Sequence, residues 1–373
     1  RYTTSGTLDA TFGSSGIVTT SIGTGNDYAR GIVIQPDGKI VVAGFAYGGS
    51  NLDFAVVRYT ISGALDSTFG NGGMVTTPVG LDNDYANSVA IQPDGKIVVA
   101  GSFNNGSDRD IAVVRYTASG MPDSTFGTNG IVTTPIGSGN DYAGGVAIQP
   151  DGTIVVAGST DNGSDDDIAV LRYTASGTLD ATFGSSGIVT THISSGDDFA
   201  GSIAIQGGGK IVVAGQAHNG VDYDFAVLRY TGSGALDPTF GSGGIVTTPI
   251  GLGKDYASGV AIQPDGKIVA AGRTNNGSDD DFAVARYNFD GSLDTDFGTG
   301  GLATTDFGGA DHSWAIALQS DGKIVVTGSG AADFALVRYN SDGSLDTDFG
   351  TGGLVTTDFG TDDGGAAVAL QPD

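Results

Sequence analysis

Short apolar segments recur along the chain, separated by turns rich in Gly, Pro and Asp. In the first full copy these segments are residues 32–35, 39–44, 54–59 and 74–77. Short runs rich in Val and Ile and bounded by turn residues are typical of β-strands. The Pro-Asp-Gly sequence at 36–38 favours a tight turn, because Pro presets φ and Gly supplies a positive φ. Each copy therefore predicts four short strands, of which the first two form a hairpin.

The second and third segments, IVVAG and FAVVRY, are apolar at consecutive positions rather than alternate ones. Such runs suit central strands with both faces buried between neighbouring sheets. The fourth segment carries two Thr residues and is expected to be more exposed.

An Arg-Tyr pair marks the period of the repeat. The spacing is 57 residues five times and 52 residues once, at Arg1, Arg58, Arg115, Arg172, Arg229, Arg286 and Arg338. Tandem four-stranded units of about 40 to 60 residues are typical of β-propeller blades. An open β-solenoid is the alternative, but its coils are usually shorter and lack such a hairpin.

The number of strands of each kind predicts the number of blades. First-strand and fourth-strand segments each occur seven times, whereas second-strand segments occur six times, starting at Lys39, Lys96, Thr153, Lys210, Lys267 and Lys323. The sequence given stops at Asp373, which is equivalent to Asp37, so residues 1–20 are expected to supply the outer strand of the last blade. We predict an all-β, seven-bladed propeller of four-stranded antiparallel blades, with residues 1–373 as one domain of six full and two partial repeats. A window cut from a longer array is the alternative.

The amino-acid composition agrees with an all-β fold and limits the kinds of partner that the chain is expected to bind. The chain has 65 Gly and no Cys, and all 42 of its acidic residues are Asp. Asp and Gly favour turns, whereas the missing Glu is a good helix former. The net charge of −26 argues against nucleic acid or an anionic membrane as a partner and leaves a cation or a cationic surface open. No apolar run reaches the length of a membrane-spanning helix, so we expect no membrane insertion.

Two columns of charged residues recur with the repeat. The Arg of each Arg-Tyr pair lies among apolar neighbours on the third strand, and a buried Arg needs an anionic partner. The Asp of the LDxTFG connection is present in every copy. We predict structural ion pairs between two sets of residues: Arg58, Arg115, Arg172, Arg229 and Arg286, and Asp66, Asp123, Asp180, Asp237 and Asp294.

Antiparallel strands bring two families of acidic loops to one face, those after the second strand and those after the fourth. Hard cations such as Ca²⁺ prefer several carboxylate oxygens from flexible loops, whereas Asp before a strand commonly accepts backbone N–H bonds in a turn. We favour the turn-forming role for these Asp residues and keep calcium binding as the alternative. No other cofactor is indicated. The calcium ligands would be Asp165, Asp166, Asp167, Asp279, Asp280 and Asp281, with Asp141, Asp198 and Asp255 nearby.

The unit closely resembles the delta-60 repeat, a family of tandem bacterial repeats. The segments that carry the resemblance are Val89–Gly101, VAIQPDGKIVVAG, and Leu65–Gly70, LDSTFG. The hairpin is also similar to that of NHL-type propeller blades, which implies that residues 32–35 form the innermost strand. The resemblance covers essentially the whole chain. It implies a secreted or surface-exposed bacterial protein and brings no general biochemical activity.

The sequence offers little material for catalysis. It has three His residues (His192, His218 and His312), no Cys and no Glu, and no nucleophile, base and orienting group can be assembled from spacing. We therefore expect a non-enzymatic, secreted or cell-surface propeller that is a structural, adhesive or ligand-binding module. Its partners would be an extracellular protein, a glycan or other domains of a larger protein. The alternative is a propeller hydrolase or lyase that acts on an extracellular polymer such as a glycan.

Overall fold

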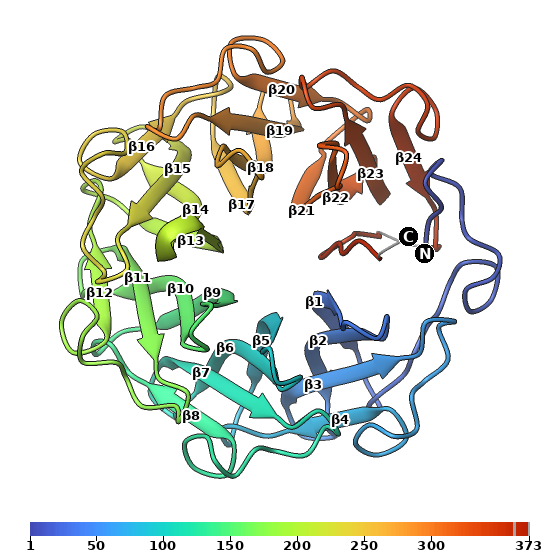
Figure 1. The fold of residues 1–373 in the computed structure, drawn as a ribbon, viewed down its shortest axis with the longest axis vertical. Coiled ribbons are helices and arrows are strands. Elements are labelled where there is room, and N and C mark those ends of the chain that lie inside the picture. Colours follow the sequence, from blue (N-terminus) through green and yellow to red (C-terminus); the bar gives the residue numbers. More distant parts are fainter. Residues whose placement is uncertain (361–362, 372–373) are drawn as a thin grey trace. The chain divides into compact units, whose positions relative to one another are not determined.

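The computed structural model describes residues 1–360 and 363–371, which contain six four-stranded antiparallel sheets. These residues form two compact units of three sheets each. Unit 1 comprises Leu8–Thr191 together with Arg1 and Gln371, and unit 2 comprises Tyr2–Thr7 and His192–Leu370. Within each unit the first strand of every sheet lies on the inner side and the fourth strand on the outer side (Figure 1).

Each sheet of unit 1 is one blade whose strands follow one another in sequence. The first blade is β1 (Asp27–Ile34), β2 (Ile40–Tyr47), β3 (Leu52–Tyr59) and β4 (Met74–Thr77). The second is β5 (Asp84–Ile91), β6 (Ile97–Asn104), β7 (Arg109–Tyr116) and β8 (Ile131–Thr134). The third is β9 (Asp141–Ile148), β10 (Ile154–Asp161), β11 (Asp166–Tyr173) and β12 (Ile188–Thr191).

Unit 2 repeats this plan. The fourth blade is β13 (Asp198–Gln206), β14 (Lys210–His218), β15 (Tyr223–Tyr230) and β16 (Ile245–Thr248), with a 3-10 turn, η1 (Gly207–Gly209), in its hairpin. The fifth is β17 (Asp255–Ile262), β18 (Ile268–Asn275), β19 (Asp280–Tyr287) and β20 (Leu302–Thr305). The sixth is β21 (His312–Leu318), β22 (Ile324–Gly330), β23 (Asp333–Tyr339) and β24 (Leu354–Thr357). In the part of the chain that the structure describes, no helical segment could span a lipid bilayer.

The first strand is longer than the apolar pattern predicts, because it contains a β-bulge. β1 begins at Asp27 rather than at residue 32, and its register against β2 shifts between Ala29 and Gly31. The bulge turns a backbone carbonyl toward the glycine of the VVAG segment. A Cβ on Gly44 would lie 1.8 Å from Tyr28 O, so this position of the second strand requires glycine.

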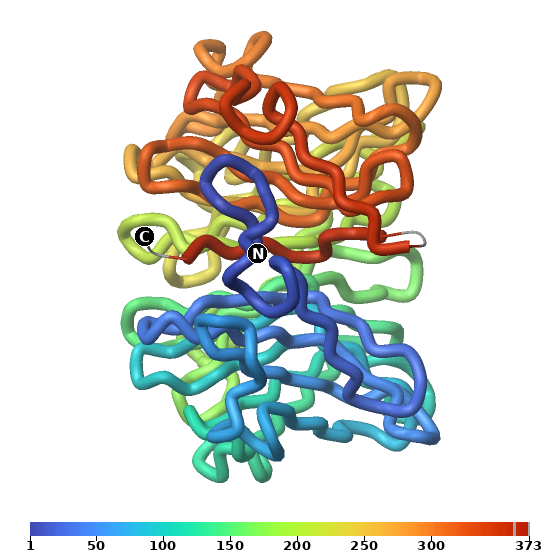
Figure 2. Tube along the Cα trace, turned by 90° about the vertical axis from the view of Figure 1, so that its right-hand side faces the viewer, coloured from blue at the N-terminus to red at the C-terminus, as the bar shows by residue number. Residues whose placement is uncertain are grey.

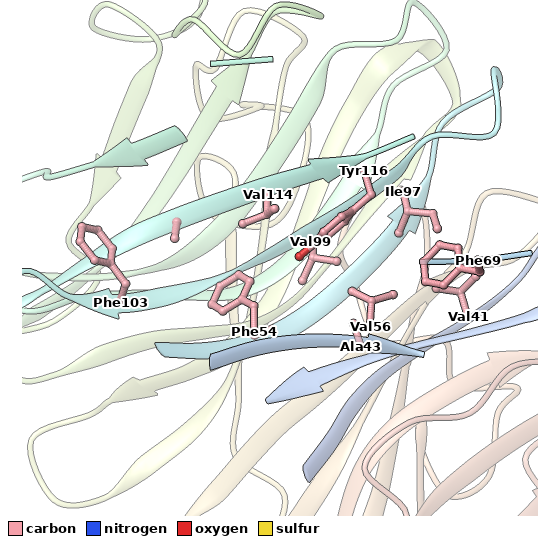
Figure 3. Close-up of a cluster of buried hydrophobic side chains, with 12 residues drawn as sticks. Val41, Ala43, Phe54, Val56, Phe69, Ile97, Val99, Phe103, Val114 and Tyr116 are labelled. Carbon is pink, nitrogen blue, oxygen red and sulfur yellow. The ribbon is translucent and has the colours of Figure 1, made fainter. Parts of the chain in front are cut away.

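The core lies between adjacent blades, as the apolar runs predict. Side chains from β2 and β3 of the first blade pack against side chains from β6 and β7 of the second (Figure 3). Consecutive residues of one strand serve different interfaces: Val99 faces the first blade, whereas Val98 belongs to the cluster with the third. Both residues are fully buried. The fourth strands are more exposed, with Thr76, Thr133 and Thr190 accessible to solvent.

Within each unit, the Tyr of an Arg-Tyr pair reaches back to the preceding blade. Tyr116 OH donates a hydrogen bond to Thr77 Oγ1 at 2.8 Å, and both groups are buried. The same bond joins Tyr173 to Thr134 within unit 1 and Tyr287 to Thr248 within unit 2, each at 2.8 Å. Thr77, Thr134 and Thr248, each at the end of a fourth strand, are therefore interblade contacts.

The prediction of seven blades is wrong, since the described residues form six. The six blades are those with a complete second and third strand, and the sequence given contains no such pair after residue 371. Residues 1–20 and 363–371 form no named strand. Without a central hairpin the inner and outer segments have no sheet to join.

The segment Tyr2–Thr7 packs on the sixth blade instead. It is drawn in dark blue beside the red C-terminal part of the chain in Figure 2. Gly350 N donates to Ser5 O at 2.9 Å, and the hydroxyls of Tyr2 and Thr357 are 2.7 Å apart. These are the contacts that an Arg-Tyr segment makes in the other blades.

Candidate functional site

The recurrent Arg and Asp residues lie together at the end of each blade that carries the LDxTFG connection. Each Arg Nε is 2.7–2.9 Å from an Asp Oδ2 eight residues later, in Arg58–Asp66, Arg115–Asp123, Arg172–Asp180, Arg229–Asp237 and Arg286–Asp294. The five Arg residues are between 0% and 8% exposed. The Asp belongs to the same blade as its Arg. Its other oxygen closes a turn, because Asp66 Oδ1 accepts from the N–H and the hydroxyl of Thr68.

A Lys at the start of the second strand joins most of these pairs. Lys210 and Lys267 lie 2.7 Å from Asp237 and Asp294. Lys39 and Lys96 lie 3.3 and 3.4 Å from Asp66 and Asp123. Thr153 stands at this position in the third blade, so Asp180 has no such Lys. Sequence reasoning missed the Lys, although its recurrence at one position was visible.

Within a unit, the guanidinium also reaches forward to the next blade. Within unit 1, Arg58 Nη1 donates to Ala118 O at 2.5 Å and Arg115 Nη1 donates to Ala175 O at 2.6 Å. The Arg58 guanidinium lies 4.6 Å from the centre of the Phe69 ring, a cation–π distance. Phe69 itself is fully buried. The Arg-Tyr pair thus connects one blade to both of its neighbours.

These pairs predict how stability responds to acid. Burial opposes ionisation of Asp123, but hydrogen bonds from Thr125 and the charges of Arg115 and Lys96 hold its pKa at about 2. A carboxylate whose folded pKa lies below its unfolded value of about 3.9 stabilises the protein above that value. This stabilisation is lost as the pH falls toward 2.

We expect the urea midpoint of unfolding to fall steeply below about pH 4. In Asp123→Asn the midpoint should change less with pH over the same window, because one of the titrating carboxylates is gone. The measurement is a series of urea unfolding curves between pH 2 and 7, with Asp82→Asn, at an exposed position in the loop before β5, as the charge-matched control. An equal slope in Asp123→Asn and the control would contradict this assignment.

The opposite end of each blade, here called the acidic end, comprises the loops after the second strand and after the fourth. In the second-strand loops an Asn folds the turn: Asn276 Nδ2 donates to Asp279 Oδ1 and Asp281 Oδ2, both at 2.9 Å. Asn162 makes the same bonds to Asp165 at 2.6 Å and Asp167 at 2.9 Å. The donor in these bonds is an Asn side chain, whereas backbone N–H donors were expected, and the Asn was not foreseen.

Consecutive Asp residues of these loops point to different sides of the strand. Asp280 accepts from Asn275 Nδ2 at 2.8 Å and lies 3.3 Å from Arg273 Nε. Asp281, next to it on β19, is bonded to Asn276 instead. The predicted ligands Asp279, Asp280 and Asp281 therefore do not converge on one point. In the third blade Asp166 and Asp167 likewise follow one another on β11, but one carboxylate oxygen of Asp165 lies within 4.8 Å of one of Asp167.

In the second to fifth blades, a buried Asp at the start of the first strand caps the loop before it. Asp141 and Asp198 accept backbone N–H bonds from Ile136 and Ile193 at 2.7 and 2.8 Å. Asp255 accepts from Ile250 N at 2.7 Å and from the Thr274 hydroxyl at 2.5 Å. Burial raises the pKa of all three carboxyls. For Asp141 and Asp255, the charge of the Asp at the second position of the preceding third strand, Asp110 or Asp224, adds to this increase.

Two groups of three carboxylates come close together in unit 2. One carboxylate oxygen from each of Asp281, Asp306 and Asp311 lies within 4.8 Å of the others. The same arrangement recurs one blade later with Asp333, Asp358 and Asp363. Of the predicted calcium ligands in unit 2, only Asp281 belongs to such a group. Asp306 and Asp358 were missed, although each replaces a residue that is not acidic in the other blades.

Aromatic rings line the acidic end of unit 1 across its three blades. Tyr28 and Phe45 have ring centres 4.9 Å apart, and Phe45 and Tyr85 have centres 5.0 Å apart. The Arg109 guanidinium continues the row, at 4.6 Å from the Tyr85 ring and 5.8 Å from the Tyr142 ring. We call these five residues the aromatic row. Tyr28 is 45% exposed, so the row opens to solvent.

The His residues have packing partners at this end of unit 2. The His218 ring lies 5.2 Å from Tyr223 and its Nδ1 accepts from Gly220 N at 3.2 Å. His312 lies 6.2 Å from the Trp314 ring and 3.4 Å from Asp280. Burial and the charge of Arg273 lower the pKa of His312.

A shallow groove of about 680 Å³ in unit 2 includes Leu302 and Tyr339 in its lining.

The repeat unit matches a known family over more than half of the chain. That family is described as a domain of unknown function, the DUF5122 β-propeller. The matched segments run from the hairpin turn to the LDxTFG connection, at residues 35–69, 92–126, 149–183, 206–240, 263–297 and 319–349. The chain belongs to the DUF5122 β-propeller family. A tandem propeller-repeat family is therefore confirmed, while the delta-60 name stays a prediction.

Solved structures resemble this DUF5122 chain in fold. Virginiamycin B lyase from Staphylococcus aureus has a TM-score of 0.52 at 16% identity, over 84% of this chain and 82% of its own. A protein from Lactobacillus plantarum has a TM-score of 0.54 at 15% identity, over 88% and 86%. Sqt1 from Chaetomium thermophilum, bound to the N-terminus of ribosomal protein L10, has a TM-score of 0.50 at 14% identity, over 88% and 86%. No curated protein sequence matches the chain.

These similarities place the DUF5122 chain among β-propellers. The three structures include an enzyme and a protein bound to a ribosomal-protein segment, and at such identities they support the fold alone. Function has to be argued from the residues of this chain.

Proposed function

We propose that this DUF5122 propeller is a non-catalytic binding module, secreted or displayed on the cell surface, whose ligand is a neutral or amino-sugar glycan. The observation that carries the proposal is the aromatic row, which crosses three consecutive blades of unit 1 and is exposed at Tyr28. Tyr side chains combine an apolar face with a polar hydroxyl and are frequent anchors in binding surfaces. A row across several blades suits an extended polymer better than a small molecule.

The groups beside the row support the choice of ligand. Asp82 and Asn83 lie in the loop before Tyr85, and Asp108 precedes Arg109. Carboxylate and amide groups accept and donate hydrogen bonds to hydroxyls and amines. The net charge of −26 disfavours sulfated or uronic-acid polymers, because like charges repel. At the end of the blades opposite the acidic end, the recurrent Arg and Asp residues form ion pairs with one another.

The proposal predicts retardation of the protein in native gels that contain a neutral glucan or chitosan, and little retardation in gels that contain an anionic polysaccharide. Tyr28→Ala should weaken binding about tenfold, because an exposed aromatic anchor is lost. The control is Ile61→Ala, which removes a side chain of 59% exposure at the opposite end of the same blade. Equal retardation of the two variants, or shortening of the polysaccharide by the protein, would contradict the proposal.

A further inference from the structure

The group Asp281, Asp306 and Asp311 combines three elements of unit 2. Asp281 lies near the start of β19, Asp306 directly follows β20, and Asp311 directly precedes β21. One oxygen from each lies within 4.8 Å of the others, a separation that a single ion between them could bridge. Asp281 is 8% exposed, Asp311 is fully buried, and Asp306 is exposed to solvent. The group is therefore a buried pair of carboxylates covered by a third that is open to solvent.

One oxygen of this group is buried without a protein partner. Asp281 Oδ2 accepts from Asn276, but among the described residues Asp281 Oδ1 has no hydrogen-bond partner. Both oxygens of Asp311 are occupied, by Phe307 N at 2.6 Å and by Ala331 N at 3.1 Å. An unpaired buried carboxylate oxygen is costly, because it has lost its water without a replacement. A cation ligand at this position would remove that cost.

The charge of Arg273 does not neutralise the three carboxylates. Arg273 pairs with Asp280, which points to the other side of β19, and the His312 ring also lies beside Asp280. Like charges at such separations repel, and a divalent cation relieves the repulsion. The ligand set consists of carboxylate oxygens alone, which suits a hard cation such as Ca²⁺.

The third carboxylate is a departure from the repeat. Among the residues that directly follow the fourth-strand segments, Asp306 and Asp358 stand where the other copies have Ser21, Pro78, Pro135, His192 and Pro249. The Asp pair of the third and first strands, by contrast, recurs in Asp110 with Asp141 and in Asp224 with Asp255. A residue that only closed the loop would not need a charge here, because Pro serves in three other copies. Asp306 thus adds a third carboxylate beside Asp281 and Asp311, which belong to the recurrent pair.

We propose that Asp281, Asp306 and Asp311 bind a calcium ion. Asp306 is the determining ligand, because it completes a pair that other blades also have. Solvent exposure of the third ligand leaves room for water to complete the coordination. A dissociation constant of about 10⁻⁴ to 10⁻³ M suits such a surface site.

The test uses the whole chain after treatment with a chelator, and Ca²⁺ alone is the probe. Asp306→Asn keeps an acceptor for Gly308 N, which is 2.6 Å from Asp306 Oδ1, and removes the charge. Asp306→Pro restores the residue of the other blades and guards against a folding defect. Asp296→Asn, an exposed residue in the fifth blade's LDTDFG connection, is the charge-matched control. Bound Ca²⁺ is counted by equilibrium dialysis, and thermal unfolding is followed with and without Ca²⁺.

We expect both Asp306 variants to bind one Ca²⁺ fewer per chain than the wild type and Asp296→Asn. The rise in melting temperature caused by Ca²⁺ should shrink in the Asp306 variants. In chelator, Asp306→Pro should melt higher than the wild type, because repulsion is relieved. Unchanged stoichiometry in the Asp306 variants would overturn the proposal. It would also be overturned if the wild type bound no Ca²⁺ at about 10⁻² M. Neither result bears on glycan binding, which is measured at Tyr28 in unit 1.

Discussion

Replacement of Asp237 by Asn is expected to lower the free energy of unfolding by about 3–5 kcal/mol. Asp237 Oδ2 lies 2.8 Å from Arg229 Nε and 2.7 Å from Lys210 Nζ. Arg229 is fully buried, so its charge cannot regain water when the carboxylate is removed. The side chain of Lys210 is 25% exposed and is partly solvated in the variant. Urea unfolding followed by circular dichroism measures the loss.

The third blade provides a matched control for this prediction. Asp180 pairs with Arg172 at 2.9 Å but has no Lys beside it, because Thr153 replaces that Lys. Its side chain is also more exposed, at 16% against 4% for Asp237. Asp180→Asn should therefore destabilise the protein less than Asp237→Asn.

A double replacement separates the charge effect from the loss of packing. When Arg229→Met is combined with Asp237→Leu, no uncompensated guanidinium remains, so the double variant should be more stable than Asp237→Asn alone. If Asp237→Asn cost less than about 1 kcal/mol, the value typical of an exposed pair, the pair would not have the role assigned to it.

The periodic features of the fold could be predicted from the sequence because each is set by local chemistry. Residues 74–77 form the strand that their pattern predicts, and the apolar runs at 40–44 and 54–57 are buried except for the half-buried Val42. The pairing of Arg58 with Asp66 follows from the cost of an unpaired buried charge. These inferences need only one copy of the repeat and its neighbours.

Features that depend on three-dimensional closeness could not be predicted in this way. The first strand begins at Asp27 because the bulge between Ala29 and Gly31 allows the polar segment to pair with the end of β2. The contact between Asp306 and Asp311 depends on how the loop after β20 folds. The predicted number of blades was wrong because each first-strand or fourth-strand segment was counted as one blade. A blade forms only where the central hairpin is present to pair with both.

The glycine in the second strand of each blade predicts a large effect from a small change. Gly215→Ala is expected to destabilise the protein by about 3 kcal/mol, at the upper end of what overpacking costs. The added Cβ would lie 1.8 Å from Phe199 O, 2.8 Å from Phe199 C and 2.9 Å from Ala200 Cα. All three atoms belong to the backbone of the bulge in β13, so no side chain can rotate away to make room. Thermal and urea unfolding of the purified variant measure the effect.

Gly207→Ala is the control that distinguishes this clash from a general effect of replacing glycine. Gly207 lies in the hairpin of the same blade, and an added Cβ there would meet no atom within 4 Å. Replacement of glycine where the backbone suits alanine changes stability by a few tenths of a kcal/mol to about 1 kcal/mol, often as a gain. A loss in Gly215→Ala no larger than in Gly207→Ala would mean that the first strand can give up its bulge at no cost. In that case the recurrent glycine would need an explanation other than the close approach of the two strands.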